Sequence, residues 1–255
     1  MSLLAVRHLK KAYGAVQALA DVSFALAAGE ALAMIGPNGA GKSTCFNILN
    51  GQIQPDAGTI ELNGRSLVGL KPHRICRLGV GRTFQIAATF GSMTVRENVQ
   101  LALLSHHRRL TSLLSLATHA YRDEADTLLA RVGMLDQAQR TCAVLAYGDL
   151  KRVELAIGLA NQPRLLLMDE PTAGMAPAER DALMQLVTSL VRTSGIGVLF
   201  TEHDMDVVFR HADRVIVLAG GALIAQGLPQ DVRADPRVRA VYLGGSPESD
   251  GPAHA

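Results

Sequence analysis

The stretch Gly36-Pro37-Asn38-Gly39-Ala40-Gly41-Lys42-Ser43-Thr44 decides the fold of this chain of 255 residues. It follows a short apolar run, Ala31 to Ile35, and precedes a segment that reads as a helix from Ser43 to about Gly51. The stretch matches GxxxxGK[ST]. The glycines of this pattern let several backbone N–H groups point at phosphate oxygens, and the following helix offers the positive end of its dipole. A strand, a glycine loop and a helix in this order predict an α/β fold.

Two side chains of this loop have specific chemistry in the pattern. Lys42 is expected to reach the β and γ phosphates of a nucleoside triphosphate, and the Ser43 hydroxyl is expected to bind Mg²⁺. The backbone of the whole loop would surround the phosphates. The candidate nucleotide-binding residues are therefore Gly36, Pro37, Asn38, Gly39, Ala40, Gly41, Lys42, Ser43 and Thr44.

Two adjacent carboxylates follow a second apolar run, Leu165 to Met168. In an open α/β sheet, ligands bind at the carboxyl ends of the strands, where Asp169 and Glu170 would lie. Neighbouring side chains of an extended chain point in different directions. Asp169 can thus hold Mg²⁺ through water, while Glu170 faces the attacking water as general base. Taken alone, the same stretch also describes an ordinary strand that leads into an exposed turn.

Two further polar residues are candidates for the same site. His203 follows the predicted strand Gly197 to Thr201, and its place beside the predicted γ-phosphate favours a phosphate contact over a structural role. Gln85 ends the segment Val80 to Gln85 and is a candidate to contact Mg²⁺ or water. An ordinary surface position fits Gln85 equally well.

Strand patterns flank the α/β part of the sequence on both sides. Leu3 to Leu9 and Ala18 to Leu26 read as strands with a turn near Gly14. Thr59 to Leu62 ends at Asn63-Gly64, a strong hairpin signal. Further on, the sequence predicts a hairpin around Gly220-Gly221, formed by Arg214 to Leu218 and Leu223 to Gln226.

The middle of the chain is mostly helical in pattern, from about Ile86 to Gly158. Thr94 and Glu97 fit a capping box at a helix start. Asp123 to Val132 has apolar residues at helical spacing. We therefore expect a helical subdomain over approximately residues 86–160, inserted in a single domain over residues 1–244. A further amphipathic helix is predicted over Pro177 to Arg192.

Composition excludes several classes of protein. The net charge of +2, with 19% charged residues, lacks the basic character of a nucleic-acid-binding protein, so no nucleic-acid partner is expected. Three scattered cysteines suggest neither a zinc site nor a disulfide framework. Apolar stretches such as Val215 to Ala225 are far shorter than the roughly 20 residues that cross a bilayer, so any membrane role must come through a partner. Residues 245–255 are small and polar, and we expect them to be disordered.

Together these motifs resemble the ABC ATPases over nearly the whole chain. By this resemblance Gly36 to Thr44 is the Walker A motif, Leu165 to Glu170 is Walker B, Gln85 lies in the Q-loop and His203 is the switch histidine. The resemblance implies a P-loop NTPase core of the ABC ATPase type, with an antiparallel β subdomain and an inserted α-helical subdomain. It also implies binding of ATP and Mg²⁺, with Glu170, His203 and Gln85 as catalytic residues and Ser43, Gln85 and Asp169 at the metal.

Two more sites follow from the resemblance alone. Tyr13 lies at the aromatic position that stacks on adenine. Leu145 to Asp149 lies at the signature motif LSGGQ, which contacts the γ-phosphate bound by the opposite subunit and here comprises Ala146, Tyr147, Gly148 and Asp149. The sequence departs from the family pattern at several positions around this composite site: Ala146 replaces Ser, Asp149 replaces Gln, Leu150 replaces a polar residue, and Ala176 replaces Asp or Asn in the D-loop.

More narrowly, the chain is similar to the ATP-binding subunits of branched-chain amino acid importers. The stretches that carry this similarity are Gly81 to Gln85, Met93 to Asn98, Leu145 to Gly148, Ala225 to Gly227 and Val241 to Gly244. The resemblance implies three kinds of partner: a second ATP-binding subunit, identical or paralogous, integral membrane permease subunits, and indirectly a solute-binding protein. It implies a peripheral location on the cytoplasmic face of the bacterial inner membrane. Ile86 to Thr94, with Phe90, is the candidate docking groove, and a buried aromatic with no docking role fits Phe90 nearly as well.

Other functions fit parts of the pattern. The chain could energise another ABC transporter, for urea, amides or lipopolysaccharide, or could be an ABC ATPase that acts outside transport. A single P-loop and the lack of a heptad run argue against the DNA-repair and translation types. A non-catalytic nucleotide-binding module is suggested by Ala146 and Leu150, but Lys42, Asp169 and Glu170 argue against it.

Overall fold

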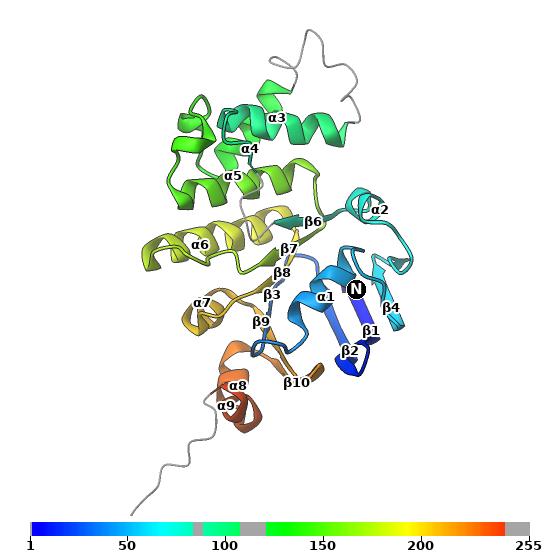
Figure 1. The fold of residues 1–255 in the computed structure, drawn as a ribbon. Helices are drawn as coiled ribbons and strands as arrows, with labels where there is room; N and C mark the ends of the chain where they lie inside the picture. Colours follow the sequence, from blue (N-terminus) through cyan, green and yellow to red (C-terminus); the bar gives the residue numbers. More distant parts are fainter. Residues whose placement is uncertain (1, 84–88, 108–120, 243–255) are drawn as a thin grey trace, which may run out of the picture.

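Strands from both ends of the chain join in one sheet in the computed structural model, which describes residues 2–83, 89–107 and 121–242 (Figure 1). The order across the sheet is β5-β4-β1-β2-β10-β9-β3-β8-β7-β6. The strands are β1 (Ser2–Tyr13), β2 (Val16–Ala27), β3 (Ala31–Ile35), β4 (Ala57–Leu62), β5 (Arg65–Ser66), β6 (Val80–Thr83), β7 (Leu165–Asp169), β8 (Gly197–Thr201), β9 (Arg214–Ala219) and β10 (Ala222–Gly227).

Helices lie between most of these strands. They are α1 (Lys42–Leu49), α2 (Pro72–Arg77), α3 (Val95–His106), α4 (Arg122–Arg131), α5 (Tyr147–Ala160), α6 (Pro177–Ser194), α7 (Met205–His211), α8 (Pro229–Ala234) and α9 (Pro236–Tyr242), with short 3₁₀ turns η2 (Leu135–Gln137) and η3 (Cys142–Val144). No helix in the described ranges is both long and apolar enough to cross a membrane.

The centre of the sheet is parallel. Strands β9, β3, β8, β7 and β6 run in the same direction, in that order. Every residue of β3 and of β8 is buried, as expected for parallel strands covered on both faces. Because parallel strands end at the same edge, the segments that follow β3, β7 and β8 emerge together. This topology brings the predicted chemical groups to one edge.

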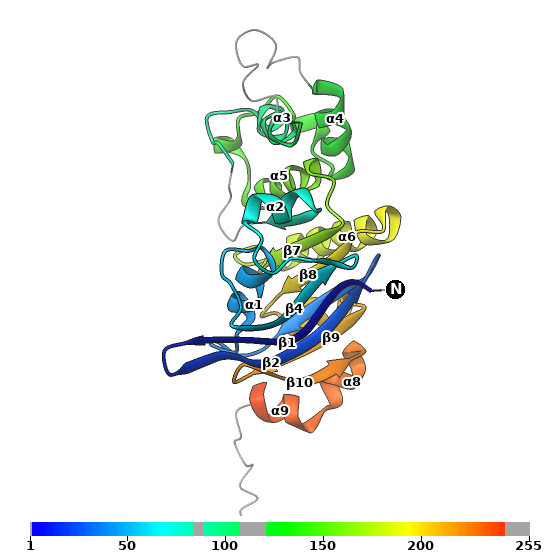
Figure 2. The ribbon, with the colours of Figure 1, turned by 90° about the vertical axis from the view of Figure 1, so that its right-hand side faces the viewer.

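The antiparallel part forms one end of the sheet. Strand β1 pairs antiparallel with β2 and with β4, and β4 pairs with β5. The turn between β4 and β5 has positive φ at Asn63 (48°) and Gly64 (74°), as an Asn-Gly hairpin requires. Figure 2 shows the β1–β2 hairpin extending beyond the rest of the sheet on the side of α1. The predicted strands and hairpin are confirmed here.

Helices α3, α4 and α5 gather beyond the β6 edge of the sheet (Figure 1). Helix α3 begins with the predicted capping box: Thr94 Oγ1 accepts from the Glu97 N–H at 3.2 Å, and the Thr94 N–H donates to Glu97 Oε2 at 2.7 Å. The buried face of α4 consists of Ala125, Leu128 and Leu129, the apolar residues expected from helical spacing. The predicted fold class, an α/β core with an antiparallel β part and an inserted helical part, is confirmed.

Candidate active site

The glycine loop between β3 and α1 passes close to neighbouring backbone. A Cβ on Gly41 would lie 2.4 Å from the Ala18 carbonyl oxygen, and the φ of Gly41 is +104°. A Cβ on Gly36 would lie 2.2 Å from the Leu218 carbonyl oxygen. Both positions therefore require glycine, because a Cβ atom would collide with a backbone carbonyl of β2 or of β9.

Lys42 is the first residue of α1 and its side chain is buried against the loop. Its Nζ donates to the carbonyl oxygens of Gly36 at 2.6 Å and of Pro37 at 3.1 Å. Burial lowers the pKa of Lys42, and the charges of Glu170 and Asp169 partly oppose that shift. The ammonium therefore lies inside the loop, close enough to both carboxylates to feel their charge.

Asp169 ends β7 with both carboxylate oxygens in contact. Thr201 Oγ1 donates to Oδ1 at 2.7 Å, and Arg82 Nη2 lies 3.4 Å from Oδ2. Asp169 and Thr201 pair directly across β7 and β8, so the contact with Thr201 follows from strand register. The carboxylate is thus held in a fixed orientation at the edge of the sheet.

Glu170 turns the chain sharply after β7. Its φ of 49° is in the left-handed region, which costs a non-glycine residue about 1–3 kcal/mol. The Glu170 N–H is held by Thr201, whose carbonyl oxygen lies at 3.2 Å and whose Oγ1 lies at 3.0 Å. The side chain then meets His203, with Nε2 of the histidine 2.8 Å from Oε1 of the glutamate. The structure thus brings Glu170 and His203 together from β7 and β8.

Glu202, the residue before His203, is buried and stabilises the turn that follows Glu170. Its Oε1 accepts hydrogen bonds from the Thr172 N–H at 2.9 Å and from Thr172 Oγ1 at 2.7 Å. Its Oε2 accepts from the His203 N–H at 3.3 Å. A buried carboxylate needs such partners, because an unpaired one would be strongly destabilising. Glu202 therefore connects the segment after Glu170 to the backbone of His203.

The chemistry of the donor set fits Mg²⁺. Ser43 offers a hydroxyl from the exposed side of α1, and Asp169 offers a carboxylate. Mg²⁺ bound with phosphates typically takes one or two such oxygen ligands from protein and keeps several waters. In the described ranges, no group of three or more His, Cys, Asp or Glu side chains could hold a metal without phosphates. Gln85, the other predicted metal contact, lies outside the described residues.

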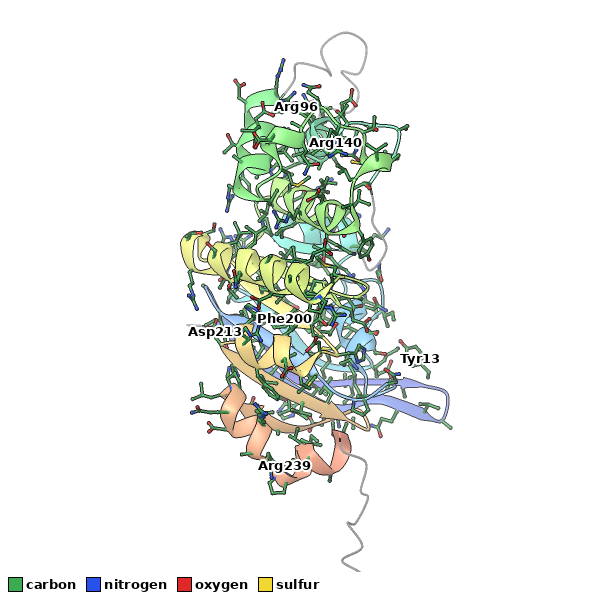
Figure 3. The ribbon with its side chains drawn as sticks, turned by 90° about the vertical axis from the view of Figure 1, so that its left-hand side faces the viewer. Tyr13, Arg96, Arg140, Phe200, Asp213 and Arg239 are labelled. Atoms are coloured by element: carbon green, nitrogen blue, oxygen red, sulfur yellow. The ribbon has the colours of Figure 1, made fainter. Side chains whose placement is uncertain are left out.

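The predicted adenine platform and signature motif lie on other elements. Tyr13 is 47% exposed at the end of β1, and Figure 3 shows it on the β1–β2 hairpin.

The predicted signature motif lies at the start of α5. Ala146 is the N-cap of α5 and supplies no side-chain cap. Tyr147 is exposed, Gly148 is buried, and Asp149 Oδ2 accepts from Gln137 Nε2 at 2.9 Å. The signature residues thus lie at the start of α5 in the helical part, and not on the elements that carry the glycine loop and the two acids.

Two residues of the site were not assigned a role from the sequence. Thr201 contacts both Asp169 and Glu170, and Arg82 contacts Asp169 and Asn47. A polar residue at the end of an apolar strand was the available signal for Thr201. The strand register that aligns it with Asp169 cannot be obtained from one sequence.

Comparison with known proteins agrees with this geometry. A family model described as "ABC transporter" matches residues 19–173. The chain belongs to the ABC transporter family. A second model, described as "Branched-chain amino acid ATP-binding cassette transporter", matches residues 222–248 of this ABC chain. The predicted family is therefore confirmed.

Relatives of this ABC ATPase cover almost all of its length. It is 42% identical to the high-affinity branched-chain amino acid transport ATP-binding protein LivG of Salmonella typhimurium, over 95% of this chain and 98% of LivG. It is 38% identical to BraF of Pseudomonas aeruginosa, which carries the same description, over 95% and 98%. The ADP conformation of MJ1267, an ATP-binding cassette of an ABC transporter, superimposes with a TM-score of 0.86 at 28% identity, over 96% of this chain and 100% of that one. These homologues confirm the predicted fold, and the family implies nucleotide binding and ATP hydrolysis.

Proposed function

We propose that this ABC ATPase hydrolyses MgATP to energise import of branched-chain or other hydrophobic amino acids through membrane permease subunits. One observation supports hydrolysis most directly: His203 Nε2 lies 2.8 Å from Glu170 Oε1, at the sheet edge where the glycine loop also begins. The transported solute is proposed from the descriptions of LivG and BraF and from the C-terminal model match.

The glycine loop and Lys42 would bind the phosphates of ATP. The loop amides and the dipole of α1 attract the phosphate charge, and Lys42 would exchange its contacts with Gly36 and Pro37 for phosphate oxygens. Ser43 and Asp169 would hold Mg²⁺, with Gln85 as the further contact predicted by the resemblance. The metal, when bound, would neutralise negative charge that develops on the phosphates.

Glu170 would act as the general base on the attacking water. Its carboxylate needs a fixed direction to accept a proton from water, and the hydrogen bond with His203 supplies one. His203 would also contact the γ-phosphate. Thr201 fixes the backbone of Glu170 and the carboxylate of Asp169, so the two acids keep distinct orientations.

A complete site would require a second ATP-binding subunit. Tyr13 would stack on adenine within one subunit, while the N-terminus of α5 would cover the ATP of the partner through Ala146, Tyr147, Gly148 and Asp149. Such a helix start offers free N–H groups to an anion. We propose either an identical copy or a paralogue as that subunit.

The membrane subunits would dock beside the metal site. A pocket of about 250 Å³ lies there, lined by residues of α2, β6 and α5 that include Ile75, Arg82 and Ile157. Phe90 is 57% exposed, as expected for a contact residue in the segment from Ile86 to Thr94, of which residues 86–88 lie outside the described ranges. Docking there would hold the protein peripherally at the cytoplasmic face of the inner membrane and transmit closure to the permease.

We also propose that residues 1–244 form one domain with a helical subdomain over approximately 86–160. A continuous buried cluster supports this, because it includes Val99 and Leu129 of the helical part with Ala33 and Phe200 of the sheet. The predicted disorder of residues 245–255 falls outside the described residues.

Transport can be tested with the chain in its natural assembly. The chain is co-expressed with its membrane subunits and reconstituted in vesicles with a solute-binding protein, and ATP-dependent uptake of leucine is compared with uptake of urea. Uptake of leucine that requires Lys42, with no uptake of urea, is expected. ATP hydrolysis without uptake of any hydrophobic amino acid would contradict the transport proposal and favour another ABC ATPase role.

A further inference from the structure

Arg82, on the edge strand β6, is a partly buried cation beside the proposed metal site. Its guanidinium reaches three acceptors: Nη1 donates to Asn47 Oδ1 at 2.8 Å and to Gln52 Oε1 at 3.3 Å, and Nη2 lies 3.4 Å from Asp169 Oδ2. Its Nε is buried without a hydrogen-bond partner in the part of the chain that the structure describes. A buried N–H without a hydrogen-bond partner is costly, which suggests that Arg82 has a role beyond packing.

The contacts of Arg82 join the two elements that carry the proposed metal ligands. Asn47 lies four residues after Ser43 on α1, so both side chains project from the same face of the helix. Asp169 ends β7 on the other side of the guanidinium. Arg82 therefore connects the helix of Ser43 to the strand of Asp169, one helical turn from the hydroxyl.

The contact with Asp169 is the longest of the three and is made with a charged group. Thr201 already occupies Oδ1 of this carboxylate, so Arg82 is the partner of Oδ2. A divalent cation that takes Asp169 as a ligand would bring two like charges within a few ångströms of each other. Like charges that share a site oppose each other, so the cation and the guanidinium compete for the same carboxylate.

From these contacts we propose that Arg82 is a positioning residue of the metal site. Its guanidinium balances the charge of Asp169 when no metal is bound, and it releases Oδ2 but keeps Asn47 when Mg²⁺ arrives. The inference deepens the proposed function and rests on the assignment of Asp169 to the metal. The competition between Arg82 and the cation makes the affinity of the site for Mg²⁺ weaker than its ligands alone would allow. Mg²⁺ is then held firmly only together with ATP.

Arg82→Met separates this role from a purely structural one. The substitution removes the charge but keeps a long flexible side chain in the same space. Asp169 then loses the nearer guanidinium charge and keeps only the influence of Lys42 in the metal-free protein, which should melt about 2–4 °C below the parent. Bound metal restores a counter-charge, so this gap should narrow when metal and ATP are added.

The experiment uses full-length protein that carries Glu170→Gln to suppress hydrolysis. Mn²⁺ is titrated in the presence of ATP, and bound Mn²⁺ is followed by its electron paramagnetic resonance signal. Adding Arg82→Met should lower the half-saturating Mn²⁺ concentration by about tenfold. A positive charge beside a carboxylate typically weakens its binding of another cation, the proton, by about tenfold or more, and we expect the same size of effect for Mn²⁺. Arg82→Lys keeps the charge and should stay within about threefold of the parent. Arg164→Met, at an exposed arginine elsewhere, serves as the matched control and should change nothing.

Two outcomes would overturn the proposal for Arg82. The first is weaker Mn²⁺ binding in both Arg82→Met and Arg82→Lys, with an equal loss of melting temperature with and without MnATP, which would mean that Arg82 only supports packing. The second is an unchanged Mn²⁺ titration in Arg82→Met. If the parent itself binds no Mn²⁺ in the presence of ATP, the metal site of the proposed function fails together with the inference. In the two outcomes above, by contrast, the parent binds Mn²⁺ and only the role of Arg82 fails.

Discussion

Glu170 combines an unfavourable backbone conformation with the central chemical role of the proposal. The left-handed φ of 49° is maintained because Thr201 binds the Glu170 N–H through both its carbonyl oxygen and its hydroxyl. Backbone strain that the surrounding structure maintains is found preferentially at functional sites. Here the strained turn directs the Glu170 carboxylate to His203. The contacts with Thr201 that maintain the turn therefore also position this hydrogen bond.

Tyr13 tests the nucleotide site at the point most distant from the chemistry. Tyr13→Ala should weaken ATP binding by about 1–3 kcal/mol, since a stack of an aromatic ring on a base contributes that much, while inorganic triphosphate should bind as before. Tyr13→Phe keeps the ring and is the matched control. Equilibrium dialysis measures both ligands. A dissociation constant for ATP that stays within twofold in Tyr13→Ala would mean that adenine lies elsewhere.

Among the residues of the candidate site, the sequence predicted those that lie in the strongest local patterns. Lys42, Asp169 and His203 each follow or begin an element that the sequence marks clearly, and the structure places them at one edge of the sheet. The partners that hold them were not predictable, because contacts such as Thr201 with Asp169 depend on strand register. Arg82 belongs to the same class, since its three acceptors come from segments 30 to 87 residues away.

Helix α7 shows at the element scale how a short helix is held beside the site. Asp204 caps it, because Oδ1 accepts from the Asp206 N–H at 3.0 Å and the Val207 N–H at 3.3 Å, and its Oδ2 pairs with Arg180 at 2.8 Å. Burial alone would raise the pKa of Asp204, but the hydrogen bonds from Val207, Arg180 and Asp206 outweigh it and the pKa lies below its ordinary value of 3.8.

This pKa shift predicts a pH-dependent loss of stability on removing the cap. A carboxyl group whose pKa is lowered by folding stabilises the protein above its unfolded pKa, and the effect is lost as pH falls through the folded pKa. Asp204→Ala should therefore cost about 1 kcal/mol at pH 7 and less as the pH falls below about 4. Asp204→Asn keeps the cap and should cost less at pH 7. Urea unfolding measures both, and a cost that does not change with pH would mean that the charge of Asp204 does not contribute to the stability of the folded protein.

The elements that the sequence missed are short or at the edge of the sheet. Strand β6 contains Gly81 and Arg82, which do not form an apolar run, and it exists because it pairs with β7. Helices α2 and α7 span six and seven residues, too few for a clear helical period. Longer elements were predicted closely: α6 ends at Ser194 with Gly195 in the left-handed conformation, near the predicted end.

In the proposed dimer, the start of α5 would face the second subunit. The N-cap is Ala146, which lacks a hydroxyl, and Asp149 adds a negative charge in the first turn. Both departures from the family's signature motif should weaken the contact with the γ-phosphate of the ATP that the partner subunit binds. The backbone N–H groups at this helix end remain available for that contact.

Ala146→Ser should therefore strengthen the ATP-dependent dimer. A hydrogen bond to a charged group contributes about 1.5–3 kcal/mol, which corresponds to at least a tenfold lower dissociation constant. Sedimentation of a hydrolysis-deficient variant with MgATP measures the dimer. Ala240→Ser, on the exposed surface of α9, is the matched control and should leave it unchanged. Equal dimer affinity in the parent and in Ala146→Ser would show that the backbone N–H groups suffice.

The most direct test of the account is a comparison of nucleotide retention and phosphate release in Glu170→Gln within the assembled transporter. Glutamine keeps the size and hydrogen bonding of Glu170 but cannot take a proton from water, so turnover should fall by about 10²–10⁴-fold. MgATP should stay bound through gel filtration, because Lys42, Ser43 and Asp169 are unchanged, whereas Lys42→Ala should lose it. Phosphate release near the wild-type rate, or loss of ATP as severe as in Lys42→Ala, would contradict the assignment of Glu170 as the general base.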